Sequence, residues 1–202
     1  MNITLEKKEH YKEVENLTRE AFWDVYKPGC DEHLILHKLR DTKSFINELD
    51  YVVIEDNKII ANIIYTKMYN EKGEMLNDVI AFGPISVHPE YQGKGIGKKL
   101  IEVSLERAKE LGYKAVLITG NDKFYKPLGF EAAYKYGITL PGMSIEDKAE
   151  FFMAMELEEG YLANHSGVYD FDKTFNVSDE ELEKFELEFP KKTKREPRDS
   201  DL

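Results

Sequence analysis

Cysteine is almost absent from this sequence: the 202 residues contain one, Cys30. An intramolecular disulfide is therefore excluded, and the composition fits a reducing compartment. We expect Cys30 to be a partly buried small hydrophobic side chain rather than a nucleophile. No apolar run approaches the roughly 20 residues needed to cross a bilayer. The first residues also lack the basic and then apolar layout of a signal peptide. The sequence predicts a cytoplasmic protein.

Positive charge is in deficit, with 28 basic against 39 acidic residues and a formal net charge of −11. Such a surface repels phosphate backbones, so nucleic-acid binding is disfavoured. It attracts cations such as amines, although the charge also serves solubility alone. The short basic run 191–195 is expected to be solvated. We predict neither a nucleic-acid nor a membrane partner, and either a monomer or a homodimer.

The length and a hydrophobic content of 42% are typical of one globular domain with an appended segment. We predict a domain over residues 1–160 and a C-terminal extension over 161–202. The last dozen residues of that extension are charged and contain proline, so disorder is expected there.

Hydrophobic spacing predicts the elements of the first half. Apolar residues recur at helical intervals from Tyr11 to Tyr26 and stop before Pro28-Gly29, and Asp31 is placed to cap a second helix. The runs Tyr51–Glu55 and Ile59–Tyr69 form a hairpin pattern. The apolar run 79–87 contains Gly83-Pro84, and because proline has no N–H, a bulge is expected there.

A strand, a glycine-rich turn, a helix and a second strand follow one another in the middle of the chain. The helix is predicted over Gly93–Leu111, with Gly112 ending it, and Ala115–Ile118 is typical of a buried parallel strand. Together these segments make a right-handed βαβ unit. Downstream, Phe130–Tyr136 is compatible with a strand. Phe151–Leu157 is either a strand or the end of a helix begun near Ser144, and periodicity does not choose.

The turn has glycine at 93, 95 and 97. Its N–H groups precede a helix, where they lack intrahelical partners and favour an anion. A P-loop is excluded because Gln92 stands where its first glycine is needed and Lys99 where Ser or Thr is needed. A dinucleotide fingerprint is excluded because Lys98 and Leu100 replace its third glycine.

The pattern that fits is Q/R-x-x-G-x-G/A, written here as Gln92-Gly93-Lys94-Gly95-Ile96-Gly97. With Phe82–Pro89 before it and Tyr125–Phe130 after the next strand, the sequence resembles the GNAT (GCN5-related) acetyltransferases over about residues 51–130. The segment Phe22–His33, together with the Phe-Tyr-x-x-x-Gly-Phe turn at 124–130, adds a finer resemblance to YhbS-like predicted bacterial acetyltransferases.

The resemblance implies an α/β fold of the GNAT type, with a mixed, mostly antiparallel twisted sheet that is splayed at the CoA site and has helices on both faces. It implies acetyl-CoA as co-substrate. The strand backbone around 85–87 would hold the pantetheine arm, the N–H groups of 93–98 would hold the pyrophosphate, and Gln92 would open the turn. The implied cofactor-binding residues are Ile85, Ser86, Val87, Gln92, Gly93, Lys94, Gly95, Ile96, Gly97, Lys98 and Asn121.

The resemblance also implies chemistry: an amine attacks the thioester directly, and Tyr125 returns a proton to the CoA thiolate. Asn121 is expected near the sulfur. The stretch from Asn121 to Tyr125 is shorter than the family's usual helix, so the tyrosine could be displaced. The base that deprotonates the amine stays open; the candidates are His88, Glu55 and Asp24.

Several alternatives stay open. Phe22–His33 is either an aromatic and acidic acceptor wall or core aromatics with solvated acids. His33 and His37, at helical spacing, could bind a metal, but a polar helix face is favoured, and no metal site is predicted. The chain could be a non-catalytic acyl-CoA-binding sensor, or use another donor such as succinyl-CoA. The acceptor is predicted only as a small-molecule or peptide amine.

Overall fold

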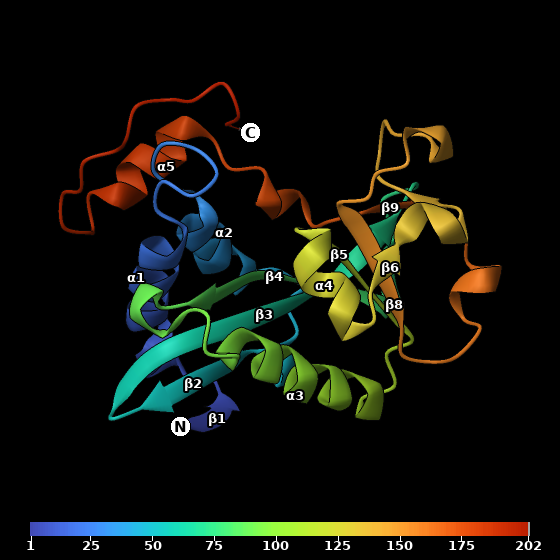
Figure 1. Ribbon diagram of the computed structural model, residues 1–202, viewed down its shortest axis with the longest axis horizontal. Helices are drawn as coiled ribbons and strands as arrows, with labels where there is room; N and C mark the ends of the chain where they lie inside the picture. Colours follow the sequence, from blue (N-terminus) through green and yellow to red (C-terminus); the bar gives the residue numbers. More distant parts are fainter. Residues whose placement is uncertain (202) are drawn as a thin grey trace.

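A single mixed sheet runs through the molecule, which the computed structural model describes over residues 1–201 (Figure 1). The strand order is β1-β2-β3-β4-β5-β8-β6, and β9 pairs with β3 and with β7. Neighbours are antiparallel except for the β4–β5 and β7–β9 pairs, which confirms the predicted mostly antiparallel mixed sheet. The strands are β1 (Asn2–Leu5), β2 (Tyr51–Glu55), β3 (Lys58–Asn70), β4 (Met75–Val87), β5 (Ala115–Thr119), β6 (Glu131–Ala132), β7 (Ile138–Thr139), β8 (Phe152–Glu156) and β9 (Gly167–Asp170).

Helices cover both faces of this sheet, as predicted (Figure 1). On one face, Leu100 of α3 joins the core cluster that contains Ile80 of β4. On the other face, Leu36 of α2 joins the cluster that contains Val52 of β2. The helices are α1 (Tyr11–Phe22), α2 (Glu32–Leu39), α3 (Ile96–Glu110), α4 (Asp122–Tyr125) and α5 (Asp179–Glu186).

The β2–β3 hairpin and the bulge in β4 lie where the sequence predicts them. Asp56 and Asn57 turn the hairpin with positive φ angles of 49° and 61°. In the β3–β4 ladder, Ile64 alone faces the two residues Gly83 and Pro84, because the register shifts there. The bulge therefore sits where proline cannot donate to the ladder.

The sheet opens between β4 and β5. Their pairing runs from Val79 with Ala115 to Ala81 with Leu117 and then stops, although β4 continues to Val87. Beyond Phe82, one edge of β4 therefore has no strand beside it within residues 1–201. This is the splayed geometry that the sequence predicts.

The first two helices begin near the expected places, but α1 ends at Phe22 rather than near Tyr26. Trp23 leaves the helical region with ψ 121°, and Asp24 adopts a positive φ of 62°. The Asp24 Oδ1 atom accepts the Gly29 N–H at 2.8 Å. This local turn ends the helix before proline does.

The region after β5 differs most from the prediction. Phe130–Tyr136 is not one strand: β6 pairs with β8 at two residues and is followed by a 3-10 helix over Ala133–Tyr136, which Gly137 ends with a φ of 70°. Phe152–Glu156 is a strand, β8, and the helix considered from Ser144 is one 3-10 turn, Ile145–Asp147.

The C-terminal part is packed against the rest of the fold. β9 pairs with β3, and Phe185 and Phe189 form a buried cluster with Leu34 of α2. Residues 187–201 then pass over α1 and the α1–α2 connection, residues 23–31 (Figure 1). None of the helices in residues 1–201 has the length and apolar character that crossing a bilayer requires.

Candidate active site

The loop between β4 and α3 presents a row of unused hydrogen-bond donors. Across the described residues, the six N–H groups from Gly93 to Lys98 donate no backbone hydrogen bond. The Lys99 N–H donates to the Gly95 carbonyl at 3.0 Å, which is the hydrogen bond that joins the loop to the start of α3. Gly93 and Gly95 adopt φ angles of 73° and 79°, which L side chains rarely adopt. Such a row at a helix N-terminus is a natural anion site.

The shape around the loop matches its donors. A Cβ at Gly93 or Gly95 would enter open space, so an anion can approach the backbone at these positions. A Cβ at Gly97 would come to 3.4 Å from Val87 Cγ2, which is an ordinary van der Waals contact. The Gln92 Nε2 group donates to the Val87 carbonyl at 3.0 Å and closes the turn.

The two lysines of the loop are on the surface. Lys94 Nζ lies 4.9 Å from the centre of the Tyr91 ring. Lys98 Nζ lies 3.9 Å from Glu102 Oε1, and its side chain is exposed. Both therefore add positive charge near the row of N–H groups without occupying it.

Residues 85–87 alternate between the two faces of the sheet. Ile85 and Val87 are half-buried and pack on the α3 side. Ser86 is buried on the other side, where its hydroxyl donates to Thr18 Oγ1 at 3.0 Å. A ligand along the open edge of β4 could therefore use the backbone of Ser86 but not its side chain.

Tyr125 lies beside the bulged strand β4, next to Phe82. Its ring packs 5.9 Å from Phe82 and 5.7 Å from Phe130, and it is 9% exposed. A Cβ at Gly120 would come within 2.6 Å of the ring, so this glycine makes room for it. Burial raises the pKa of Tyr125 to about 12, and Tyr26 acts in the same direction. The hydroxyl makes no hydrogen bond to a residue within 1–201 and stays protonated at neutral pH, as a general acid requires.

Asn121 lies at the start of the single turn α4. Its Oδ1 atom accepts the Lys123 N–H at 3.0 Å and caps the helix. The side chain is thus already engaged. The short helix brings Tyr125 against Phe82 of β4 rather than away from the sheet.

The three candidate bases are each engaged elsewhere. Both Asp24 oxygens accept backbone N–H groups, from Gly29 at 2.8 Å and from Arg195 at 3.1 Å. Although desolvation acts against it, these bonds lower the pKa of Asp24. Glu55 lies at the tip of the β2–β3 hairpin, 3.9 Å from the amino group of residue 1. His88 Nδ1 accepts the Glu90 N–H at 3.3 Å and caps a 3-10 turn.

Sequence reasoning missed Glu32, the first residue of α2. Its carboxylate is half-buried, and burial raises the pKa of Glu32 to about 7. The one available signal was its place in the Phe22–His33 segment, since burial of a single acidic residue cannot be seen in the sequence.

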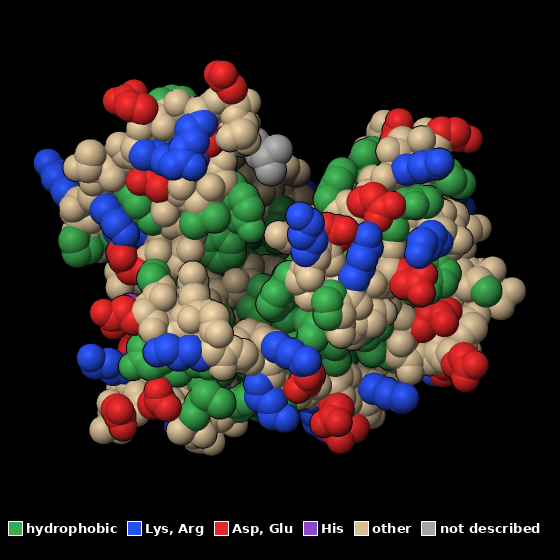
Figure 2. Space-filling view, in the orientation of Figure 1, with side chains coloured by type: hydrophobic (Ala, Val, Ile, Leu, Met, Phe, Trp, Pro, Cys, Tyr) green, Lys and Arg blue, Asp and Glu red, His purple; other side chains and the backbone are tan. Residues whose placement is uncertain are grey.

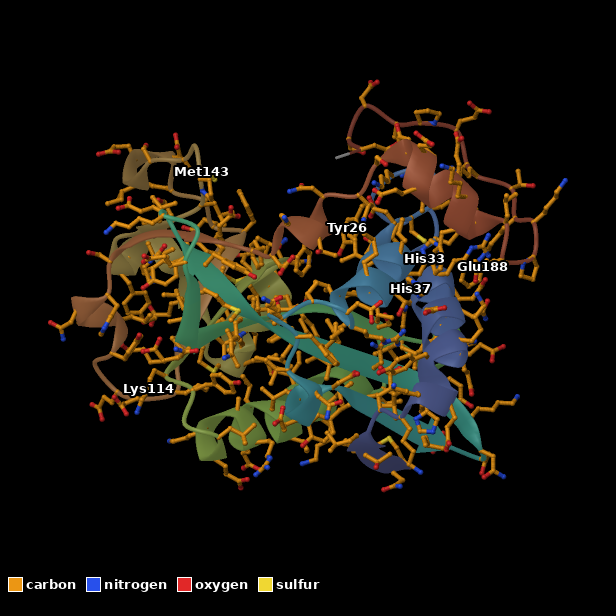
Figure 3. The ribbon with its side chains drawn as sticks, turned by 180° about the vertical axis from the view of Figure 1, so that it is seen from behind. Tyr26, His33, His37, Lys114, Met143 and Glu188 are labelled. Atoms are coloured by element: carbon orange, nitrogen blue, oxygen red, sulfur yellow. The ribbon has the colours of Figure 1, made fainter. Side chains whose placement is uncertain are left out.

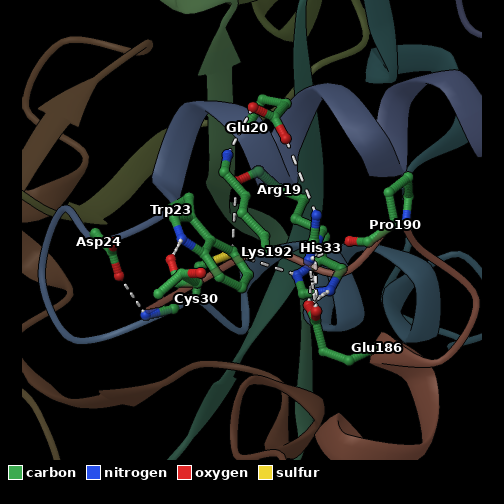
Figure 4. A network of polar contacts seen from close by, with 11 residues as sticks. Arg19, Glu20, Trp23, Asp24, Cys30, His33, Glu186, Pro190 and Lys192 are labelled. Atoms are coloured by element: carbon green, nitrogen blue, oxygen red, sulfur yellow. Dashed lines mark hydrogen bonds and ion pairs between the residues drawn. The ribbon is translucent and has the colours of Figure 1, made fainter. Parts of the chain in front are cut away.

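A buried polar network joins α1, α2 and α5 (Figure 4). Arg19, 2% exposed, donates from Nη2 to Glu186 Oε2 at 2.7 Å, and His33 Nε2 lies 2.8 Å from Glu186 Oε1. Cys30 is 3% exposed next to them, and burial raises the pKa of its thiol, so it is the inert small side chain that the sequence predicts.

His33 and His37 contact different carboxylates. His37 Nδ1 lies 2.7 Å from Glu15 Oε1 of α1, whereas His33 contacts Glu186 of α5. Over residues 1–201, no group of three or more His, Cys, Asp or Glu side chains is arranged to hold a metal ion.

The C-terminal segment holds the α1–α2 connection in place (Figure 4). Trp23 Nε1 donates to the Thr193 carbonyl at 3.1 Å, and the Arg195 side chain donates from Nε to the Asp24 carbonyl at 2.9 Å. Lys192 adds an ion pair to Glu20 at 2.7 Å.

Hydrophobic side chains line a hollow in the middle of the face seen in Figure 2. In the flanking segments, Val25 and Tyr26 of the α1–α2 connection are each 51% exposed, and Phe124 of α4 is 45% exposed. In Figure 3, Tyr26 lies beside α2, on the side that faces the centre of the molecule.

Residues 11–130 match the model of the acetyltransferase (GNAT) family, which is more than half of the chain. The chain belongs to the GNAT family. This GNAT chain is 26% identical to the uncharacterized N-acetyltransferase YhbS of Escherichia coli K12 over 145 residues, 72% of this chain and 83% of YhbS. It is 34% identical to YjhQ of the same organism, also named an uncharacterized N-acetyltransferase, over 77 residues; this match covers 38% of this chain and 42% of YjhQ.

Two crystal structures share the GNAT fold with this chain. E. coli YhbS in complex with CoA has a TM-score of 0.75 at 23% identity, covering 87% of this chain and 92% of that one. A Brucella melitensis GNAT acetyltransferase in complex with acetyl-CoA has a TM-score of 0.68 at 23% identity, covering 87% and 97%. The GNAT and YhbS-like resemblance seen in the sequence is thereby confirmed.

Proposed function

We propose that this chain transfers the acetyl group of acetyl-CoA to a primary amine by direct attack. The observation that carries the proposal is the unpaired row of N–H groups at Gly93–Lys98, next to the open edge of β4. A pyrophosphate needs such donors at close approach, and a pantetheine arm needs an extended edge.

The comparisons support the same cofactor. The structures of YhbS and of the Brucella melitensis enzyme contain CoA and acetyl-CoA on the same fold. The E. coli relatives are named N-acetyltransferases. Acetyl-CoA supplies an activated thioester, so the protein has to place the amine, polarise the carbonyl and protonate the departing sulfur.

We assign these tasks to two places in the site. A backbone N–H near Ile85 polarises the thioester carbonyl, since the strand is bulged and unpaired on its β5 side there. Tyr125 donates the proton to the sulfur, since its protonated hydroxyl lies beside the bulge at Phe82 and has no partner among the described residues.

A non-catalytic acyl-CoA sensor is the second candidate. One observation favours it: Asp24 and His88 already accept backbone N–H groups, and Glu55 lies 3.9 Å from the amino group of residue 1. The loop contacts phosphates and does not select the acyl group, so succinyl-CoA belongs among the donors to be tested.

Ligand-induced stabilisation followed by turnover tests the proposal. Acetyl-CoA and CoA should raise the melting temperature, whereas ATP and NAD at equal concentration should not. Acetyl-CoA with a panel of amines should then release free thiol, with succinyl-CoA as a second donor. Stabilisation without amine-dependent thiol release would favour the sensor, and no stabilisation would refute both functions.

A further inference from the structure

We propose that Thr18 of α1 is a positioning residue for acetyl transfer: its hydroxyl holds Ser86 of β4 and thereby aligns the neighbouring backbone N–H groups of that strand with the thioester. This inference rests on the proposed acetyl transfer and concerns the same site. Thr18 contacts the Ser86 side chain and acts through it, without touching the cofactor or the amine itself.

Ser86 lies where β4 is held along one edge only. It pairs with Asn62 of the antiparallel strand β3. On the other edge, the pairing of β4 with β5 ends at Ala81 within the described residues. A strand segment that is paired on one side can turn about its own axis more easily than one paired on both. The orientation of this segment therefore depends on how its side chains are anchored.

The open edge of β4 receives the N–H groups of Ile85 and Val87. The N–H of His88 points to β3, because it donates to the Ile60 carbonyl at 2.8 Å. Successive residues of a strand direct their N–H groups to opposite edges. The N–H groups of Val87 and, by the same alternation, Ile85 therefore point away from β3. These are the groups that a thioester lying along the open edge would meet.

The Ser86 side chain is anchored on α1, which packs on β3 and β4. Ser86 Oγ donates to Thr18 Oγ1 at 3.0 Å, and Thr18 Oγ1 donates in turn to Asn62 Oδ1 at 3.3 Å. The three side chains are each at most 1% exposed. They form a buried polar chain that ties one helix to a residue pair on two adjacent strands.

This polar chain lies where apolar contacts would hold the helix as well. Val14 and Leu17 of α1 belong to the same core cluster as Val52 of β2. The Nδ2 group of Asn62 is buried and donates to no residue within 1–201. A buried amide with an unused donor destabilises a fold relative to apolar side chains of similar shape. The orientation that the chain gives to Ser86 therefore explains it better than stability does.

The catalytic consequence concerns the N–H group near Ile85 that we assign to the thioester carbonyl. The bond between Thr18 and Ser86 limits rotation of the peptide planes next to Ser86. Removing an oxyanion donor outright costs about 100- to 1,000-fold in kcat, so turning one out of line should cost about tenfold or more. Acetyl-CoA affinity should change little, because the N–H groups of residues 93–98 do not depend on this bond.

Two substitutions at one position separate the hydroxyl from the packing. Thr18→Val keeps the shape and leaves Ser86 and Asn62 without their partner, whereas Thr18→Ser keeps the hydroxyl and loses a buried methyl group. Both should lower the urea midpoint. Only Thr18→Val should lower kcat, by about tenfold or more, with the Kd for acetyl-CoA little changed. Thiol release is measured with hydroxylamine, ethylamine, phenethylamine and spermidine, and the amine with the highest wild-type rate is used for the comparison.

Ser44→Ala is the matched control. Ser44 is also fully buried, and its hydroxyl donates to Asp172 Oδ2 at 2.7 Å. Its carbonyl accepts the Lys67 N–H of β3, on a different stretch of that strand from Asn62. Ser44→Ala should lower stability and keep kcat.

Ser86→Ala breaks the proposed bond from the strand side and should lower kcat as Thr18→Val does. It carries the test if Thr18→Val does not fold. Wild-type kcat in the folded variants that lack this bond would overturn the inference. So would an equal loss of kcat in Thr18→Ser or Ser44→Ala, because activity would then follow stability rather than the hydroxyl.

The wild type separates this inference from the proposed function. If it binds acetyl-CoA and releases thiol with an amine, either contrary result rejects only the role of Thr18. Absent acetyl-CoA affinity, or binding without amine-dependent thiol release, rejects the proposed acetyl transfer and the role of Thr18 with it.

Discussion

Replacing Gly95 by valine tests the phosphate-binding loop most directly. Gly95 has a φ of 79° and open space where a Cβ would point, so the new Cβ meets no protein atom. It strains the backbone by about 1–2 kcal/mol and stands where the pyrophosphate has to approach. A hydrogen bond to a charged group contributes about 1.5–3 kcal/mol, so losing two costs about 3–6 kcal/mol. The Kd for acetyl-CoA should therefore rise at least about 100-fold.

Gly112 provides a matched control at the other end of α3. Its φ is 90°, and a Cβ there also meets no protein atom. Gly112→Val should lose the same conformational stability and keep the affinity for acetyl-CoA.

Calorimetric titration and thermal unfolding measure both quantities. At 100 times the Kd, acetyl-CoA should stabilise the wild type by about 2.7 kcal/mol, or about 5–11 °C, and should leave Gly95→Val almost unshifted. Wild-type affinity in Gly95→Val, or equal loss in both variants, would refute the reasoning.

Three further predictions concern the general acid and the buried network. Tyr125→Phe should lower kcat about 100-fold or more with little change in acetyl-CoA affinity; steady-state kinetics with unchanged kcat would exclude the role. Glu186→Gln should destabilise the fold by about 3–5 kcal/mol, because Arg19 stays buried without its carboxylate. A shift in the urea midpoint worth under about 1 kcal/mol would contradict this expectation. For His33, burial lowers the pKa to about 4, with Arg19 in the same direction and Glu186 opposed. Because the unfolded chain then takes up the proton first, His33 should make stability fall from its full value above about pH 6.5 by about 3 kcal/mol towards pH 4. The stability difference between wild type and His33→Asn should trace this dependence in acid unfolding curves; a pH-independent difference would count against it.

The parts of the fold that follow from local chemistry could be predicted from the sequence. Gly93 and Gly95 adopt positive φ angles, which glycine favours, and Pro84 cannot donate to a ladder. The positions of these residues in the sequence therefore predicted the loop and the bulge. The hairpin turn at Asp56 and Asn57 was visible for the same reason.

The parts that depend on distant contacts could not be predicted. The turn that ends α1 at Phe22 is held through Asp24 by Arg195, which is 171 residues away in the chain. Phe130–Tyr136 has the composition of a strand, but β8 offers it only two pairing partners. Burial raises the pKa of Glu32 to about 7, and no spacing in the sequence reveals this burial.

The contacts between residues 187–201 and the α1–α2 connection have a practical consequence. The family match ends at residue 130, which invites an expression boundary soon after the core. A chain cut there, or at 160, would lose the partners of Arg19, Trp23 and Asp24 and would uncover Leu34. Limited proteolysis near residue 187 should therefore loosen the α1–α2 connection, which flanks the hollow, before it unfolds the sheet. Acceptor preference would then vary among preparations that differ only in where the polypeptide stops.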